Sequence, residues 1–559
     1  MHKLRKRRII ETLAAFAGAG VVIIELAHHI LVNHYHFPDQ TVDICIVTLA
    51  GALLCTLAWR WFGGIKKKRR VKVELILIPL VILAVAILDI RFFMQMGEHD
   101  EEAVSETRWE NSIAVMPFVN RSGDEEQDIL CEGLTEELIN RLSNIKDLKV
   151  SASTSIFAFK GEKIIIQDVG EKLKVEKILE GSVRKSGDQF RISVQLINVE
   201  DGFHIWSEQY PMQLDDLFNI QDEISIKVIE KLQLDIREEE RIKLTKKSTS
   251  DIDAFKFYMK GKLLRYHERP KEMLMARDYL MESIRKDPEY APAYAGLAEN
   301  YMVLGLWSVI PQSEAASKAK EAVQKALELD EDLSEVHVSI GVIKMVFDWD
   351  WEGAEEELKL AIGLNPNNFD AHREYALLLF RTYRYVEAEK EFFISMELDP
   401  LNFLPVRDLR ALYLIRGRDE KAENLNKRLQ KIEPDWSDFW KDSYYNIDRA
   451  SRKIQEQGRN PIYISNLAIA YVKSGELNPA LKLIEELESI YQEGQEGNVA
   501  FILASIFNEM NENEMTLSWL ERAVEKKAPR LINLGISLPF VSLQKETRFH
   551  ACLERIGLK

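Results

Sequence analysis

The chain of 559 residues carries 74 Lys and Arg against 90 Asp and Glu, which gives a formal net charge of −16. A surface that binds nucleic acid concentrates basic residues, and here they cluster only beside apolar runs, so we expect no nucleic-acid partner. The four cysteines form no Cys-x-x-Cys pair and no spacing typical of a metal site, which argues against a disulfide framework. The length allows three or four domains.

Three apolar runs open the chain, at 9–32, 42–62 and 73–96. Each of them reaches the roughly 20 residues that a helix needs to cross a bilayer. Lys and Arg lie before the first run and between the second and third, whereas the other flanks lack them or are acidic. Because basic flanks stay inside, residues 1–97 are predicted to form a membrane-embedded anchor of three transmembrane α-helices with an inside amino terminus.

Ionisable side chains within these runs form the strongest candidate site. The predicted intramembrane polar cluster consists of Glu25, His28, His29, Asp89 and Arg91. Charged groups at that depth are costly unless they pair, and they often mark function. One interpretation is a metal, haem or proton site that also uses His34 and His36. The alternative is that the cluster only fixes the packing of the three helices, so no cofactor is assigned.

An acidic linker over 98–110 is predicted to lead into an α/β domain over 111–236. Its first apolar run is strand-like, and the apolar residues that follow recur at helical spacing. Further alternating runs predict an α+β domain with a mixed sheet of about five strands and two or three helices. The expected strands are 112–118, 148–152, 177–185, 189–198 and 204–210, and the expected helices are 127–142, 166–173 and 214–234.

Four stretches of this domain carry a family resemblance: SIAVMPFVNRSGDEEQDILCEGLTEELINRLS (112–143), SASTSIFAFKG (151–161), residues 169–210, and DLFNIQDEI (216–224). The domain resembles the TolB amino-terminal-like domain of bacterial proteins, which occurs fused to transcriptional or cyclase modules and is followed by tetratricopeptide repeats. The resemblance implies no defined activity. Together with the predicted spans, it implies a multi-pass protein of the bacterial inner membrane, with its amino terminus in the cytoplasm and its other domains in the periplasm.

The motifs of several enzyme classes are absent from the sequence. It contains no phosphate-binding loop, no dinucleotide-binding glycine motif, no zinc-protease motif and no nucleophile elbow. The only space before the α/β domain is taken by the apolar runs, so no cyclase domain is expected. The sequence therefore predicts a protein that is not an enzyme.

From residue 251 the chain repeats itself at about 34 residues. The repeats end at Asp287-Pro288, Asp330-Glu331, Asn365-Pro366, Asp399-Pro400 and Glu433-Pro434. This pattern resembles the tetratricopeptide repeat, a pair of antiparallel helices, and predicts about seven pairs in an all-α solenoid over 250–535, closed by a capping helix over 536–559. The first gap of 43 residues indicates an insertion near 307–313.

Tetratricopeptide arrays present a concave face to partner proteins. The repeat register places His267, Tyr301, Leu379 and Tyr413 near that face, although packing between repeats is the favoured interpretation of these large residues. The sequence thus predicts a non-enzymatic scaffold, or a sensory component of the cell envelope, with a protein partner on the solenoid. The alternative is a membrane module that binds a metal, haem or proton. The oligomeric state is not predicted.

Overall fold

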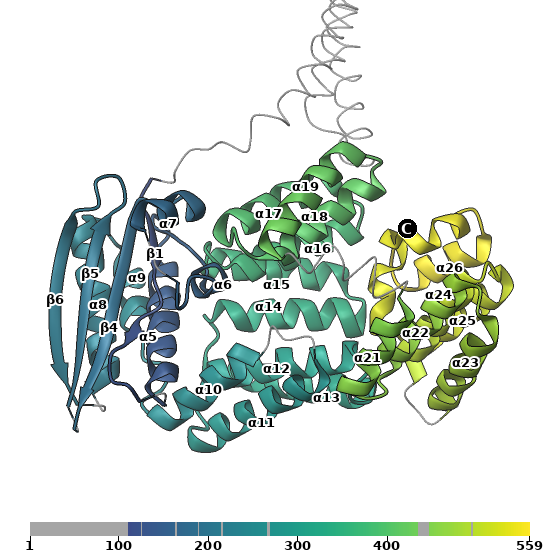
Figure 1. Cartoon of the computed structure of the whole chain (residues 1–559), viewed down its shortest axis with the longest axis horizontal. Coiled ribbons are helices and arrows are strands. Elements are labelled where there is room, and N and C mark those ends of the chain that lie inside the picture. The colour runs from purple at the N-terminus through teal and green to yellow at the C-terminus, as the bar shows by residue number, and fades with distance from the viewer. Residues whose placement is uncertain are drawn as a thin grey trace, which may run out of the picture. The chain divides into compact units, whose positions relative to one another are not determined.

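The computed structural model describes residues 110–558 except 125, 163–164, 188, 214–215, 265–268, 434–445 and 493–495. These residues belong to one compact unit, Arg108–Lys559. Figure 1 shows a sheet with its helices, then a run of helix pairs, then a C-terminal group of helices.

Within the described part of the chain, none of the helices is both long enough and apolar enough to span a membrane. The predicted fold class, which counted three transmembrane helices, is contradicted by this finding. The fold is a mostly helical repeat array with a small mixed sheet. The predicted multi-pass location in a bacterial inner membrane depended on those helices and is contradicted as well. The runs 9–32, 42–62 and 73–96 themselves lie outside the described residues.

The described helices have a different pattern from a membrane span. Several of them are amphipathic: in α19 (Asp419–Ile432), Ala422 and Leu429 are buried while the residues between them are exposed or partly exposed. One apolar stripe with a polar opposite face is what a helix needs to pack in a layered or repeat fold. Run length and flanking charge, on which the membrane prediction rested, carry no information about such packing.

The sheet contains six strands in the order β3–β1–β4–β5–β6, with β2 pairing on β4 as well. Its strands are β1 (Ser112–Val115), β2 (Val119–Asn120), β3 (Lys149–Val150), β4 (Lys177–Ser186), β5 (Gln189–Asn198) and β6 (His204–Met212). β1 runs parallel to β3 and β4, while β4, β5 and β6 form an antiparallel meander. The predicted mixed sheet is confirmed, and β5 has the predicted bounds.

One face of the sheet is covered by helices. Ile192 of β5 pairs with Val183 and with Tyr210, and all three are buried. α5 (Glu126–Ser143) packs against α8 (Leu217–Leu232); α5 contacts β1, β2 and β3, and α8 contacts β6 (Figure 1). Three shorter helices complete this part of the chain: α6 (Ser153–Phe157), α7 (Ile166–Leu173) and α9 (Glu238–Thr245).

Five helix pairs follow. They are α10 (Ile252–Leu264) with α11 (Pro270–Lys286), α12 (Ala291–Leu306) with α13 (Gln312–Leu329), α14 (Ser334–Ile343, continued by η3, Lys344–Asp348) with α15 (Trp351–Leu364), α16 (Phe369–Arg381) with α17 (Tyr385–Leu398), and α18 (Phe403–Ile415) with α19 (Asp419–Ile432). Small residues allow the two helices of a pair to cross closely: a Cβ on Gly261 would lie 2.7 Å from Leu280 Cγ. This geometry supports the predicted tetratricopeptide-like repeats.

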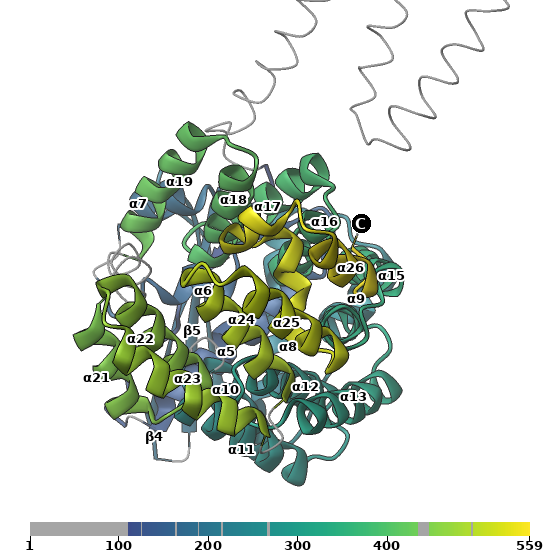
Figure 2. The same cartoon turned by 90° about the vertical axis from the view of Figure 1, so that its right-hand side faces the viewer.

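The C-terminal helices contact the second, third and fourth helix pairs instead of only extending the stack, and in Figure 2 they lie in front of the other helices. They are α21 (Ile447–Gln457), α22 (Pro461–Ser474), α23 (Leu477–Gln492), α24 (Glu496–Glu509), α25 (Asn513–Glu525), η4 (Pro529–Ile536), η5 (Leu538–Leu543) and α26 (Thr547–Arg555). α24 contacts α13, and η4 contacts α12 and α16.

The predicted insertion near 307–313 is the place where this contact forms. Asn460 Nδ2 donates to the carbonyl of Trp307 (2.8 Å), and Arg530 Nε donates to the carbonyl of Leu306 (3.1 Å). A second turn is used in the same way, since Trp351 Nε1 donates to the carbonyl of Ile556 (2.7 Å). The C-terminal helices therefore cover the turns that join α12 to α13 and α14 to α15.

Candidate functional site

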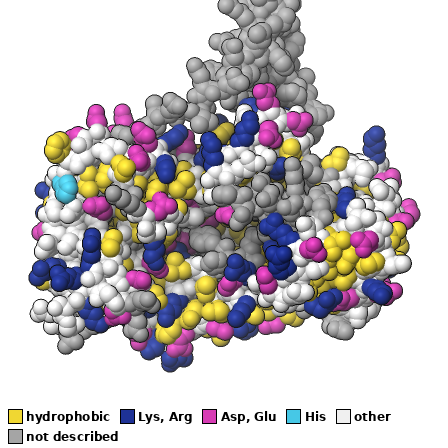
Figure 3. Space-filling view, in the orientation of Figure 1, with side chains coloured by type: hydrophobic (Ala, Val, Ile, Leu, Met, Phe, Trp, Pro, Cys, Tyr) yellow, Lys and Arg dark blue, Asp and Glu magenta, His cyan; other side chains and the backbone are white. Residues whose placement is uncertain are grey.

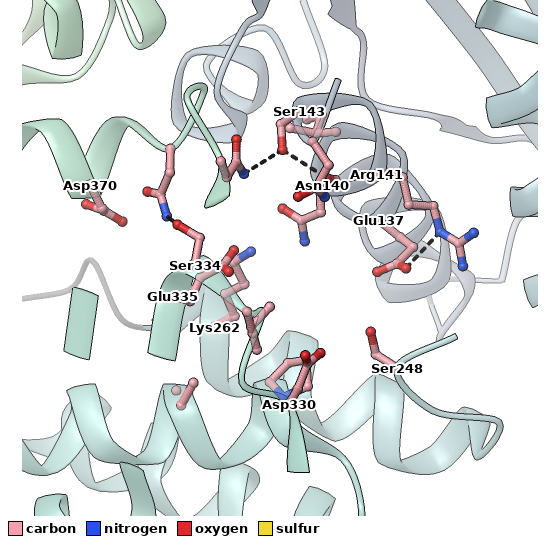
Figure 4. A pocket seen from close by; sticks show the side chains of 18 of the residues that line it. Glu137, Asn140, Arg141, Ser143, Ser248, Lys262, Asp330, Ser334, Glu335 and Asp370 are labelled. Carbon is pink, nitrogen blue, oxygen red and sulfur yellow. Dashed lines mark hydrogen bonds and ion pairs between the residues drawn. The ribbon is translucent and has the colours of Figure 1, made fainter. Parts of the chain in front are cut away.

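A cavity of about 430 Å³ lies between the sheet-bearing part and the helix pairs. One wall comes from α5, α9 and the segment after α9. The opposite wall comes from α10, α12, α14 and α16, the first helices of four consecutive pairs. Figure 4 shows Glu137 and Ser143 of α5 facing Ser334, Glu335 and Asp370 across this space. The volume falls within the range typical of ligand-binding sites.

The two walls are joined by a row of residues that we call the repeat-end ladder: Asp287, Asp330, Asn365 and Asp399. These are the positions that end the repeats in the sequence, and each contacts the sheet-bearing part or the segment that follows it. Thr249 Oγ1 donates to Asp287 (2.5 Å), Lys246 Nζ pairs with Asp330 (2.6 Å), Asn365 Nδ2 donates to Ser143 Oγ (3.0 Å), and the Ser155 amide donates to Asp399 (2.9 Å).

Asn367 strengthens the ladder beside Asn365. Its Nδ2 donates to the carbonyls of Ser143 and Leu148, both at 2.9 Å, and its Oδ1 accepts from the amide of Val150 (3.3 Å). The last carbonyls of a helix have no partner within the helix. A buried side chain from a repeat turn therefore satisfies backbone groups between the end of α5 and β3.

Asp399 is fully buried at the α6 end of the ladder. Burial raises the pKa of its carboxyl from 3.8 to about 6, although hydrogen bonds from Ser155 and Asn402 act in the opposite direction. The ladder thus contains one carboxylate whose charge changes near neutral pH.

Helix α5 approaches α10 closely at a glycine. A Cβ on Gly133 would lie 2.5 Å from Phe255 Cε1, so only glycine leaves room for that ring. Nearby, Lys262 Nζ of α10 pairs with Glu136 Oε2 of α5 at 3.0 Å. Glu136 and Lys262 are only 6% and 17% exposed, so this ion pair is more shielded from solvent than a surface pair.

The cavity wall is more acidic than basic. Six carboxylates and four basic side chains line it: Glu137, Glu299, Asp330, Asp332, Glu335 and Asp370, with Arg141, Lys243, Lys246 and Lys262. Glu299, Glu335 and Asp370 come from α12, α14 and α16, one from each helix. On the outer face shown in Figure 3, by contrast, acidic and basic side chains are intermixed.

Asn300 also lines the cavity and is buried, with 5% of its surface exposed. Its Nδ2 donates to the carbonyl of Met273 (3.0 Å), but its Oδ1 accepts no hydrogen bond from any described residue. A buried acceptor without a donor costs free energy. The wall therefore combines negative charge with an acceptor that lacks a partner.

The sites predicted from the sequence fall elsewhere. Glu25, His28, His29, His34, His36, Asp89 and Arg91 lie outside the described residues, as does His267. Tyr301, Leu379 and Tyr413 are buried, in agreement with the favoured packing interpretation. Among the residues that the structure describes, no group of three or more His, Cys, Asp or Glu side chains is arranged to hold a metal ion.

The sequence pattern did not reveal the cavity residues, because the repeat endings indicate only where each helix pair ends. A partial signal was present: the second residue of α10, α14 and α16 is acidic (Asp253, Glu335 and Asp370), and two of these three residues line the cavity. Nothing in the sequence indicates that the α/β part faces the first helices of the pairs.

A family described as the HilA/YgeH-like transcriptional regulator, second domain, matches residues 109–227. The predicted TolB amino-terminal-like assignment is therefore not confirmed. A protein named putative adenylate cyclase 3 from Rhizobium meliloti (strain 1021) is 31% identical over 236 residues, which cover 41% of this chain and 40% of the relative. The transcriptional regulator HilA of Salmonella typhimurium is 22% identical over 299 residues, covering 52% and 51% of the two chains. The chain thus spans between two fifths and half the length of the curated relatives it matches.

Solved structures with helical repeats overlap parts of the chain. Yeast Tom70 aligns with a TM-score of 0.30 and 14% identity, covering 55% of this chain and 68% of that one. YrrB, described as a TPR protein with an unusual peptide-binding site, aligns with a TM-score of 0.22 and 22% identity, covering 33% and 88%. PilW, a type IV pilus biogenesis factor, aligns with a TM-score of 0.26 and 14% identity, covering 42% and 94%.

Proposed function

We propose that the protein is a non-enzymatic interaction scaffold, and that the cavity between the sheet-bearing part and the helix pairs receives a segment of a partner protein. The observation that carries this proposal is the position of the cavity. It is lined by the first helices of four consecutive pairs, and these helices form the surface with which helical-repeat proteins bind their partners.

The relatives support a regulatory or interaction role. One is named as a putative adenylate cyclase and another as a transcriptional regulator, and each shares only part of its length with this chain. A part found in proteins with such different activities fits interaction or regulation better than either activity alone. In this proposal the α/β domain at 111–236 and the repeats at 250–535 bind the partner together, and residues 536–559 cap the end of the repeats.

The test is affinity capture with the full-length protein from extracts of its own cells. Asn140 lines the cavity from α5, so Asn140→Trp places a large ring in the space. Gln209 is exposed on β6, and Gln209→Trp adds the same ring away from the cavity. We expect a specific partner with the wild type and with Gln209→Trp, and its loss with Asn140→Trp at unchanged thermal stability. Equal capture by both variants would disprove a role for the cavity.

A further inference from the structure

We infer that the open face of the sheet binds a phosphorylated side chain of a partner protein through three arginines. We call these residues, Arg121, Arg184 and Arg191, the arginine row. None of the three lines the cavity, so this second surface is independent of the function proposed for the cavity.

The face of the sheet that α5 and α8 leave uncovered is polar. β4 and β5 lie side by side (Figure 1), and every second residue of each strand points to this face. The intervening residues, such as Val183 and Ile192, are buried on the covered face. The uncovered face carries partly or fully exposed side chains in this part of the sheet: Glu180, Ser182, Arg184, Ser186, Gln189, Arg191, Ser193 and Gln195.

The strand register brings the arginine row together. Arg184 and Arg191 lie directly opposite each other in the antiparallel pair of β4 and β5, and both are exposed. Asn120 of β2 pairs with Val183, and the amide of Arg121 donates to the carbonyl of Val183 (2.8 Å). Because side chains alternate along a strand, Arg121 comes on the open face beside Arg184. The three arginines thus follow one another across β2, β4 and β5.

The arginine row has no acidic partner. Among the residues that the structure describes, none forms a hydrogen bond or an ion pair with these three side chains. The neighbouring Asp124 pairs instead with Lys185, at 3.7 Å. Like charges directly opposite each other destabilise a sheet. The row therefore destabilises the free protein, and a bound anion removes this repulsion.

A single phosphate group fits the row better than a series of carboxylates. Side chains on one side of an extended segment recur at about 6.6 Å, whereas neighbouring strands of a sheet lie about 4.8 Å apart. Separate carboxylates of one segment would therefore not match the three arginines. A phosphate monoester places roughly two negative charges and three acceptor oxygens at one point, and guanidinium groups bind such a group with paired hydrogen bonds.

The positive charge on this face is confined to one row. Along β4 and β5, the residue pairs on either side of it are uncharged: Ser186 with Gln189, and Ser182 with Ser193. The pair beyond the two serines contains Glu180. A nucleic acid carries a phosphate at every nucleotide and needs a longer basic surface. The short row matches one phosphate, and the neighbouring serine hydroxyls can donate further hydrogen bonds to it.

The experiment uses three labelled seven-residue peptides and the full-length protein. GAGpSGAG carries one phosphoserine, GAGEGAG carries one carboxylate, and GAGSGAG carries neither. Fluorescence anisotropy at low salt measures binding, with inorganic phosphate as a competitor and a single-stranded oligothymidylate as a separate probe. We expect GAGpSGAG to bind at least about tenfold more tightly than the other two peptides. Inorganic phosphate should displace it, and added salt should weaken its binding.

The protein variants locate the site. The double variant Arg184→Gln, Arg191→Gln should weaken binding of GAGpSGAG about tenfold or more. The control double variant Arg241→Gln, Arg452→Gln removes the same charge at exposed positions of α9 and α21 and should leave binding unchanged. Circular dichroism verifies that both variants are folded.

Three results overturn the inference: equal binding of GAGpSGAG and GAGEGAG, equal loss with both double variants, or tighter binding of the oligothymidylate that depends on Arg184 and Arg191. The last result would assign the arginine row to the phosphates of a nucleic acid. None of the three affects the proposed function of the cavity, which is tested separately by capture with Asn140→Trp.

Discussion

Ser155 donates both its backbone amide and its hydroxyl to the same carboxylate oxygen of Asp399, which lies 244 residues further along the chain. The Ser155 hydroxyl accepts in turn from the amide of Leu401 (2.9 Å), and the amide of Ala152 donates to the carbonyl of Leu398 (2.9 Å). Helix α6 is thereby fixed to the turn between α17 and α18 by four hydrogen bonds.

This contact should be sensitive to pH. Because burial raises the folded-state pKa of Asp399 from 3.8 to about 6, the folded protein binds the proton more tightly than the unfolded chain. The stability contributed by the proton on Asp399 is complete below about pH 4 and is lost as the pH rises through about 6. A pKa shift of this size corresponds to a change of roughly 3 kcal/mol in the free energy of unfolding.

Guanidinium unfolding at pH 5 and pH 8 measures the effect, compared between wild type and Asp399→Asn. We expect the wild type to lose more unfolding free energy than the variant between these two pH values, because Asn cannot ionise. An identical pH dependence in the two proteins would show that Asp399 does not titrate in this range.

Asn367, which lies beside the repeat-end ladder, should be sensitive to truncation. Asn367→Ala removes four side-chain hydrogen bonds, the longest of them to the carbonyl of Ile145 (3.5 Å), and leaves the carbonyls of Ser143 and Leu148 buried without this donor. We expect the free energy of unfolding to fall by about 2–4 kcal/mol. The exposed control Gln209→Ala should change it by less than about 0.5 kcal/mol; a similarly small change for Asn367→Ala would contradict the role assigned to the ladder.

Gly133 should not tolerate even one added methyl group. An alanine Cβ there would lie 2.5 Å from Phe255 Cε1, so we expect Gly133→Ala to destabilise the protein by about 1–3 kcal/mol through overpacking. At Gly363 of α15, a Cβ would meet no atom of another described residue within 4 Å beyond the backbone of its own helix. Gly363→Ala should therefore stabilise by up to about 1 kcal/mol. Thermal unfolding of both variants tests the packing argument, because helix propensity alone predicts that alanine stabilises the protein at both positions.

Arg373, which is partly buried, and Arg381, which is buried, should respond in opposite ways to the same substitution. Arg373 makes two hydrogen bonds to Asp408 (3.0 and 2.8 Å), which is buried. Arg381 is bonded to Asn533 Oδ1 (2.9 Å) and Met345 Sδ (3.2 Å), with no carboxylate in ion-pair range among the described residues, and burial lowers its pKa to about 10.

Arg373→Met leaves a buried carboxylate with less compensation, and we expect a loss of about 3 kcal/mol or more. Arg381→Met removes a charge that burial already disfavours, so its unfolding free energy should stay unchanged or rise. Denaturant unfolding of the two variants provides the comparison. A loss for Arg381→Met as large as that for Arg373→Met would indicate that the charges of Glu374 and Asp408 offset the burial of Arg381.

The local elements were predictable because their signals are local. β5 and α7 have the bounds that alternation and helical spacing predict, and the repeat endings mark the ends of α11, α13, α15 and α17. The predicted membrane architecture was wrong, because apolar run length and flanking charge were the only observations behind it. The polar cluster within those runs lies outside the described residues and stays a prediction.

The candidate site was not predictable for a physical reason. Asn365 and its partner Ser143 are 222 positions apart, and nothing in either local pattern specifies the other. The acidic wall is built from one residue per helix, so no continuous motif exists in the sequence. Only the stacking of the pairs brings Glu299, Glu335 and Asp370 to the same cavity.

The repeat-end ladder has a consequence for how such a chain can evolve. Free-standing repeat arrays gain or lose whole units readily, because each unit contacts only its neighbours. Here the four ladder residues each contact a different partner: Thr249, Lys246, Ser143 and Ser155. Duplicating or deleting one unit between α10 and α18 would put every later ladder residue opposite the wrong partner. The number of units in this half is therefore fixed by the α/β part, whereas the helices beyond α19 are held by other contacts, to the turns after α12 and α14.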